Sequence, residues 1–246
     1  MSSPLGISIT WLGHATVLYR SSRGKAVLVD PWFDGNPSAP PDAKNLSSVD
    51  LMLVTHGHAD HFADVIPVAR KFHPDIVCNY EISIYLGSKG IAKLHGINQG
   101  GTVAFDGIKV TMVQALHSSS IVDGDRVLPG GGPCGFVIEF ENGTRVYHAG
   151  DTAFFGDMKW IGDLYKPSIA VLPIGDVFTM APREAAIAAA LIGARHVVPI
   201  HHSSFPALTG TPAELKRHLG DQRDIEVVDV KPGETVGADL VREGSR

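Results

Sequence analysis

The sequence predicts an α/β fold, and three features of its 246 residues support this class. Short apolar runs, typical of buried strands, alternate with segments whose apolar residues keep helical spacing. Glycine, proline, asparagine and aspartate separate these segments as turn residues. Several predicted strands also run directly into histidine or aspartate, at the strand ends where layered α/β folds carry their sites. We find no linker, short repeat or low-complexity tract and expect one domain over residues 1–246.

The N-terminal third predicts strands that are interrupted by one irregular segment. Residues 34–45 are rich in proline, alanine, asparagine and aspartate and predict a surface loop. A later helix should extend to Phe72, with Asp64 as its cap and Pro67 in its first turn, where the missing N–H of proline is tolerated. The expected strands are residues 7–12, 16–19, 25–29, 51–54 and 76–78, and a helix over residues 81–88 should end at Gly90.

The middle of the chain predicts two β-hairpins. Asp106-Gly107 and Asn142-Gly143 are two-residue sequences of the kind that close tight hairpin turns. Between the two hairpins, residues 120–133 are rich in glycine and predict a loop. The expected strands are residues 102–105 with 108–115 in the first hairpin, and 135–140 with 144–147 in the second.

The C-terminal part alternates strands with helices that have clear start and stop signals. Pro182 opens an alanine-rich helix that Gly193 closes. The sequence Thr-Pro-Ala-Glu at residues 211–214 is a capping box with proline at the first helical position, so another helix starts there. A helix is also expected over residues 157–165, and strands over residues 169–174, 196–200 and 225–230.

Composition and charge argue against several classes of function. The net charge of −5 and the isoelectric point near 6.2 give no electrostatic reason to expect nucleic acid or an acidic membrane as a partner. No apolar run approaches the roughly 20 residues that span a bilayer, and the first residues lack the features of a signal peptide, which predicts a cytoplasmic protein. Cys78 and Cys134 lie in no C-x-x-C pattern, and we expect two buried, reduced thiols.

Histidine is the unusual residue in this composition, and three of the 12 histidines lie in one turn. His56, His58, Asp60 and His61 follow a predicted buried strand and precede a helix, so they share a strand-to-helix turn. Four potential ligands on one turn do not easily reach a single ion, so this H-x-H-x-D-H pattern suits two. A solvated histidine-rich turn is the simpler interpretation, but the density of ligands argues against it.

Three further metal-competent residues follow predicted strands elsewhere in the chain. His117, Asp151 and His201 each lie just beyond one of the strands given above. Each of them alone is as easily a turn or capping residue. Because strand ends are held rigidly at a sheet edge while the side chains beyond them can converge, the set together predicts a metal site.

These residues give the chain a resemblance to the metallo-β-lactamase-fold hydrolases. The H-x-H-x-D-H turn, a downstream histidine, an aspartate after glycine and a late histidine follow the ligand order of that superfamily. The chain is most similar to a family of metal-dependent hydrolases that includes relatives of ascorbate-phosphate lactonase. The resemblance implies an αβ/βα four-layer sandwich, with two mixed sheets face to face, helices on both outer faces and metals at one sheet edge. It is carried by residues 11–16, 116–119, 147–152, 172–176, 178–180 and 199–201.

The resemblance also implies a site for two divalent metal ions, with Zn2+ expected and Mn2+, Ni2+ or Fe2+ as alternatives. A water or hydroxide between the ions would be the nucleophile, its pKa lowered toward neutrality. His202 stands where relatives often have tyrosine, and Asp176 where some have glycine or histidine; both departures touch the substrate region. One ion would be held by His56, His58 and His117 and the other by Asp60, His61 and His201, with Asp151 bridging.

A second set of residues is expected close to this centre. Asp60 and His14 are the candidate catalytic residues; for His14, contact with a ligand or substrate stays open against a structural hydrogen bond. Asp30 would either orient a ligand imidazole or cap the turn before Pro31. The remaining expectations are that Ser118, Ser119 and Thr152 hydrogen-bond the ligands, that His148 is structural, and that loops 118–133, 178–180 and 202–208 shape the substrate pocket.

The leading functional hypothesis is a hydrolase that cleaves an ester, lactone or phosphodiester bond in a small molecule. A phosphodiesterase or nuclease acting on RNA or a nucleotide is the enzymatic alternative, but neither a basic patch nor a large insertion between Asp151 and His201 supports it. A metal or ligand sensor with little turnover is a second alternative, which the complete ligand set argues against. A homo-oligomer is expected by analogy with relatives alone.

Overall fold

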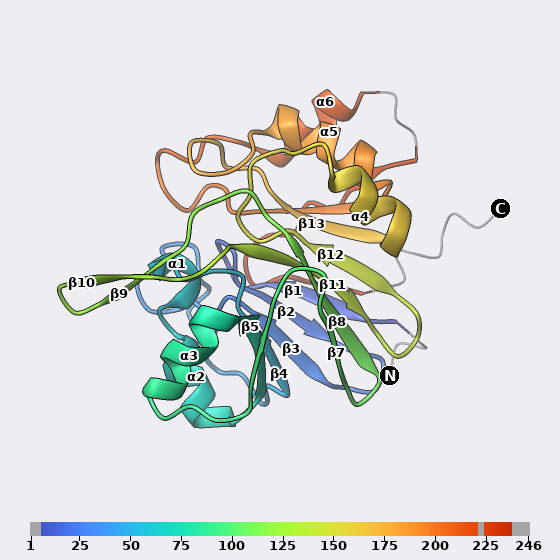
Figure 1. Cartoon of the computed structure of the whole chain (residues 1–246). Coiled ribbons are helices and arrows are strands. Elements are labelled where there is room, and N and C mark those ends of the chain that lie inside the picture. Colours follow the sequence, from blue (N-terminus) through green and yellow to red (C-terminus); the bar gives the residue numbers. More distant parts are fainter. Residues whose placement is uncertain (1–5, 221–223, 238–246) are drawn as a thin grey trace.

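Two seven-stranded mixed sheets pack face to face, with helices on both outer faces (Figure 1). This computed structural model describes residues 6–220 and 224–237; residues 1–5, on which the expected lack of a signal peptide partly rests, lie outside the described residues. No helix in the described part of the chain is long and apolar enough to cross a membrane. The order of the layers confirms the α/β sandwich that the sequence predicts.

The first sheet has the strand order β16-β1-β2-β3-β4-β5-β6. Its strands from β16 to β3 are antiparallel to their neighbours, and those from β3 to β6 are parallel. The parallel strands therefore present their carboxyl ends at one edge. The bounds are β1 (Ser8–Trp11), β2 (Val17–Arg20), β3 (Ala26–Val29), β4 (Leu51–Leu53), β5 (Asp75–Asn79), β6 (Leu94–Ile97) and β16 (Thr235–Gly237).

The second sheet repeats this plan in the order β15-β14-β13-β12-β11-β8-β7. Strands β7, β8, β11 and β12 are antiparallel, and β12 to β15 are parallel. Each sheet thus joins an antiparallel half to a parallel half. The bounds are β7 (Thr102–Phe105), β8 (Ile108–Gln114), β11 (Cys134–Glu139), β12 (Arg145–His148), β13 (Ile169–Pro173), β14 (His196–Ile200) and β15 (Glu226–Val227).

Three apolar cores hold the four layers together. The central core lies between the sheets and includes Trp11, Tyr19 and Phe136. A second core joins the second sheet to α4, α5 and α6, and a third joins the first sheet to α1, α2 and α3. Burying one large apolar side chain contributes roughly 1.5–3 kcal/mol to the stability of the fold. The three cores therefore stabilise the layers that meet at the sheet edge carrying the site. The helices are α1 (Ala59–Phe62), α2 (Val65–Phe72), α3 (Tyr80–Ser88), α4 (Met158–Tyr165), α5 (Pro182–Ile192) and α6 (Pro212–Leu219).

The structure corrects the expected loop at residues 120–133. This segment contains a small hairpin in which β9 (Ser120–Asp123) pairs with β10 (Arg126–Pro129). In Figure 1 the hairpin extends from the body of the protein beyond α1. The glycine content of this segment predicts turns. It does not show that two short strands on either side of a turn satisfy each other's backbone hydrogen-bonding groups.

The expected helix after the histidine turn is divided into α1 and α2, and Asp64 does not cap α2 with its side chain. Instead, Oδ2 of Asp64 accepts the backbone N–H groups of Phe33, at 2.6 Å, and Asp34, at 3.0 Å. The last expected strand, 225–230, is only β15 in the structure, and the edge strands β6 and β16 have no counterpart among the predicted strands.

Candidate metal centre

The histidine turn begins just after β4, and α1 completes it in a single helical turn. Gly57 lies between His56 and His58, directly under the base of the β9–β10 hairpin. A Cβ atom at this position would lie 2.7 Å from Ile121 and 2.9 Å from the carbonyl oxygen of Ser120. Only glycine avoids these contacts, so the hairpin base fixes the backbone between the two histidines.

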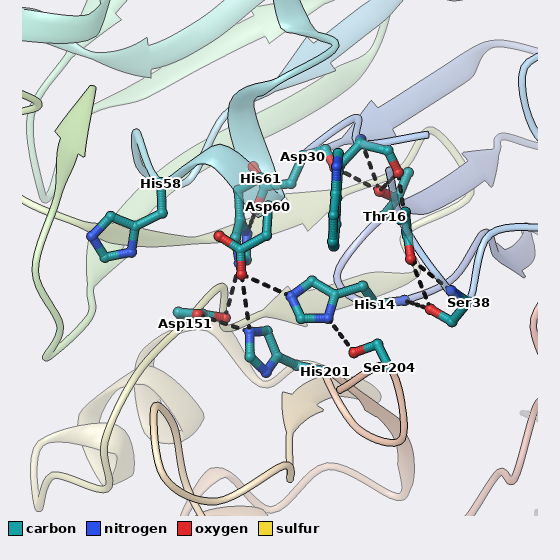
Figure 2. A network of polar contacts seen from close by, with 12 residues as sticks. His14, Thr16, Asp30, Ser38, His58, Asp60, His61, Asp151, His201 and Ser204 are labelled. Atoms are coloured by element: carbon teal, nitrogen blue, oxygen red, sulfur yellow. Dashed lines mark hydrogen bonds and ion pairs between the residues drawn. The ribbon is translucent and has the colours of Figure 1, made fainter. Parts of the chain in front are cut away.

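The predicted ligands gather in two groups, and within each group the ligand atoms lie within 4.8 Å of one another. Each group combines side chains from the histidine turn with a side chain that follows a strand of the second sheet. Figure 2 shows members of the second group pointing toward one another. The first group is His56, His58 and His117; the second is Asp60, His61 and His201, joined by His14 from the end of β1.

Asp151, which follows β12, touches both groups. Its Oδ2 lies 3.6 Å from Nε2 of His117 and 3.1 Å from Nε2 of His201. Its Oδ1 lies 3.3 Å from Nε2 of His61. The side chain is only 3% exposed, so its carboxylate is largely shielded from solvent. One carboxylate thus stands between two sets of imidazoles, which is the position that a bridging ligand requires.

The polar atoms that face this centre fit a metal ion. Nε2 of His61, Nε2 of His201 and Oδ1 of Asp151 are buried and have no hydrogen-bond partner among the described residues. Buried polar atoms without a hydrogen bond are destabilising, and a cation can satisfy several of them at once. Imidazole nitrogen and carboxylate oxygen are the ligands that zinc and its first-row neighbours bind.

The electrostatics of the first group favour neutral imidazoles. Burial lowers the pKa of His56 well below its ordinary value, and it also lowers the pKa values of His58 and His117. A neutral imidazole keeps a free lone pair, which is the form that coordinates a metal. The three side chains are therefore prepared for coordination by their surroundings.

His61 is held from behind by Asp30, which follows β3. Nδ1 of His61 lies 2.8 Å from Oδ2 of Asp30, which leaves Nε2 to face Asp151. Burial alone would lower the pKa of His61, but Asp151 and Asp30 raise it well above its ordinary value. The two carboxylates thus favour positive charge beside this ring, which a bound cation would supply. Of the two expectations for Asp30, the contact supports orientation of the imidazole.

His14 reaches the second group from the end of β1 (Figure 2). Its Nε2 lies 3.0 Å from Oδ2 of Asp60, and its Nδ1 lies 2.5 Å from Oγ of Ser204. Burial lowers the pKa of His14 to about 4. Burial would raise the pKa of Asp60, but the hydrogen bond from His14 and the nearby His61 hold it below its ordinary value. Sequence reasoning did not single out Ser204, because no local pattern joins two residues that are 190 positions apart.

The three hydroxyl residues expected beside the ligands have different positions. Oγ of Ser118 lies 3.4 Å from Nε2 of His58, as expected. Oγ of Ser119 instead accepts the backbone N–H of Gly57 at 3.2 Å and so supports the turn. The prediction for Thr152 is wrong, because its hydroxyl bonds to backbone atoms. It accepts the N–H of Leu116 and donates to the carbonyl oxygen of Ala153.

Two other side chains lie outside both groups. His148 is fully buried, with Nδ1 2.8 Å from the hydroxyl of Tyr19, in agreement with a structural role. Asp176 is exposed, and its carboxylate accepts the neighbouring N–H of Val177 at 2.7 Å. No described contact joins Asp176 or the segment 178–180 to the ligand groups, so their place in a substrate pocket stays a prediction.

Comparison with known proteins identifies the family. A model described as the beta-lactamase superfamily domain matches residues 25–202. The chain is 52% identical over 237 residues to a UPF0173 metal-dependent hydrolase of Rubrobacter xylanophilus, covering 95% of this chain and 97% of that protein. It is 48% identical to a UPF0173 metal-dependent hydrolase of Koribacter versatilis, over 94% and 97% of the two chains. The solved structure of Igni18, a metallo hydrolase from Ignicoccus hospitalis, is similar with a TM-score of 0.84 and 33% identity, over 94% and 98% of the chains. The chain therefore belongs to the beta-lactamase superfamily and, with its UPF0173 relatives, is a metal-dependent hydrolase.

Proposed function

We propose that this enzyme is a dinuclear hydrolase that cleaves an ester, lactone or phosphodiester bond in a small molecule. The position of Asp151 carries the proposal. Its two oxygens lie within 3.6 Å of three histidines, of which one belongs to the first ligand group and two belong to the second. A carboxylate can bind two cations at once, and its charge reduces the repulsion between them.

The donor set favours zinc as the metal. The first group is purely imidazole, and the second adds the carboxylate of Asp60 to imidazoles. Zn2+ accepts both ligand types, and manganese, nickel or iron remain alternatives that metal analysis distinguishes. When bound, two such ions would supply Lewis acidity and a nucleophile derived from water at neutral pH, chemistry that suits both acyl and phosphoryl substrates.

Apolar side chains beside the centre suit a small organic substrate. Leu116 precedes the ligand His117 and is 52% exposed. Phe205 is 37% exposed, and its ring lies 5.5 Å from the ring of His14 and 5.9 Å from that of Trp32. Exposed apolar groups beside convergent polar groups are the usual lining of small-molecule sites. We therefore propose a substrate with an apolar portion next to the bond that is cleaved.

We also propose that the enzyme acts in the cytoplasm. Cys78 and Cys134 are buried free thiols, as the sequence predicts. Burial raises the pKa of Cys78 to about 12 and that of Cys134 well above its ordinary value. Inert buried thiols of this kind are typical of proteins in reducing compartments.

The test is a substrate screen with controlled metal content. The purified protein is stripped with a chelator, reloaded with Zn2+ or Mn2+, and assayed with a p-nitrophenyl ester, a lactone, bis(p-nitrophenyl) phosphate and an RNA oligonucleotide. We expect turnover of at least one small molecule that is lost on stripping and restored on reloading. Cleavage of RNA alone would support the nuclease alternative, and full metal loading without any turnover would support a sensor.

A further inference from the structure

Asp60 is the least constrained of the candidate ligands in the second group. Its side chain is 32% exposed, whereas those of His61 and His201 are at most 1% exposed. It lies on α1, a helix of four residues that has no side-chain cap. Among the described residues, the hydrogen bond to His14 is the only one that its carboxylate makes. Nε2 of His201 lies 3.9 Å from the same oxygen, so the bond to His14 at 3.0 Å is the closest contact that places this carboxylate.

His14, in contrast, is among the most constrained residues near the centre. It is fully buried, and its backbone N–H donates to Oγ of Ser38 at 2.9 Å. Its carbonyl oxygen accepts from Nε1 of Trp11 at 2.9 Å and from the N–H of His201 at 2.8 Å. These bonds hold the backbone of His14 at a φ of 52°, which is rare for a residue other than glycine.

Ser204 completes the environment of the His14 ring. Its Oγ lies 2.5 Å from Nδ1, on the side of the ring away from Asp60 (Figure 2). If the hydroxyl donates to Nδ1, the ring proton is on Nε2 and donates to the carboxylate of Asp60. The other neutral tautomer would place a nitrogen lone pair 3.0 Å from a carboxylate oxygen, which is repulsive. The arrangement thus favours one tautomer and one role for the ring.

We propose that His14 is a positioning residue that holds Asp60 in place for the second metal, with the hydroxyl of Ser204 bonded to Nδ1 of the tautomer that donates. The inference rests on the dinuclear site proposed above. Each carboxylate oxygen has two lone pairs, so Oδ2 of Asp60 can accept from His14 and keep a lone pair for the metal. A hydrogen bond to a metal ligand of this kind typically changes metal affinity by about 10- to 100-fold.

Three variants separate this role from direct coordination by His14. His14→Ala removes the donor, and Ser204→Ala removes only the hydroxyl that bonds to Nδ1 of the ring. His14→Gln places an amide N–H near the position of Nε2, so it keeps a donor for Asp60 while it replaces imidazole as a metal ligand. Ser203→Ala is the matched control, because the Ser203 hydroxyl lies next to His202, 3.0 Å from its Nδ1.

The measurement is stepwise Zn2+ binding to the metal-free proteins in competition with a chelator, which does not depend on any substrate. We expect His14→Ala to weaken the second ion by about 10- to 100-fold and Ser204→Ala by a smaller factor. His14→Gln, Ser203→Ala and the first ion in every variant should stay within about threefold of wild type.

Two outcomes would overturn the proposal with the dinuclear site intact. The first is a His14→Ala protein that binds both ions as wild type does. The second is a His14→Gln protein as weak as His14→Ala, which would make His14 a direct ligand. If His14→Ala does not fold, the Zn2+ affinities of His14→Gln and Ser204→Ala still test the proposal. A wild-type protein that binds fewer than two ions would instead overturn the proposed function and this inference together.

Discussion

The backbone N–H of His201 donates a hydrogen bond of 2.8 Å to the carbonyl oxygen of His14. His14 follows β1 in the first sheet, and His201 follows β14 in the second. This bond joins the two sheets at the place where their ligands meet, and the two rings lie 4.0 Å apart between centroids. The geometry of the second ligand group is therefore set by how the sheets pack on each other.

Asp151→Asn should lose at least one metal ion and nearly all hydrolysis while the fold is kept. The substitution preserves the shape of the side chain but removes the charge that both ligand groups share. His148→Gln is the comparison, because His148 is buried three residues earlier and contacts Tyr19 rather than a ligand; we expect a much milder effect on activity. Metal stoichiometry, circular dichroism and turnover check both variants. Two ions and near-normal turnover in Asp151→Asn would show that the bridging assignment is wrong.

Asp30→Asn should weaken metal binding by about 10- to 100-fold, because Asp30 orients the imidazole of His61. The carboxylate also accepts the backbone N–H of Thr55 at 2.8 Å, so a loss of about 1–3 kcal/mol in the free energy of unfolding is expected. Asp50→Asn is the matched control. Asp50 precedes β4, at the end of that strand opposite to Thr55, and its carboxylate accepts the backbone N–H of Ala26. Competition titration and urea unfolding measure the two effects. Equal metal affinity in both variants would argue against the role of Asp30.

Acid should destabilise the metal-free protein partly through His148. Burial lowers its pKa from the ordinary 6.5 to about 4, so the unfolded chain binds a proton in a pH range where the folded chain does not. The stability that neutral His148 contributes is present above pH 6.5 and is lost as the pH falls toward 4. Between pH 7 and 5 the free energy of unfolding should fall by about 2 kcal/mol more in wild type than in His148→Gln. Urea unfolding at the two pH values tests this, and parallel losses in both proteins would contradict it.

Much of the fold could be predicted because its strands and helices have local signals. The helix predicted from residues 211–214 starts as expected, with Oγ1 of Thr211 accepting the N–H of Glu214 at 3.2 Å, although the Glu214 carboxylate bonds to the Thr211 hydroxyl and not to its N–H. The strands β6 and β16 could not be predicted in this way. They are short edge strands that contain glycine, and pairing with a neighbour rather than their own sequence defines them.

The candidate ligands could be predicted because histidine and aspartate are rare in such density and each follows a strand. The residues that orient them could not, because their contacts join distant parts of the chain. Asp64, for example, has the sequence position of a helix cap, yet it binds backbone N–H groups about 30 residues earlier. Ser204 similarly contacts His14 only because the two sheets close on each other.

Anomalous diffraction from a crystal of the metal-loaded enzyme tests the dinuclear centre most directly. We predict two metal peaks roughly 3.5–4 Å apart. Asp151 should lie between them, with His56, His58 and His117 around one ion and Asp60, His61 and His201 around the other. A single ion held by only three of these side chains, with the remaining ones turned away at full metal loading, would contradict the dinuclear centre.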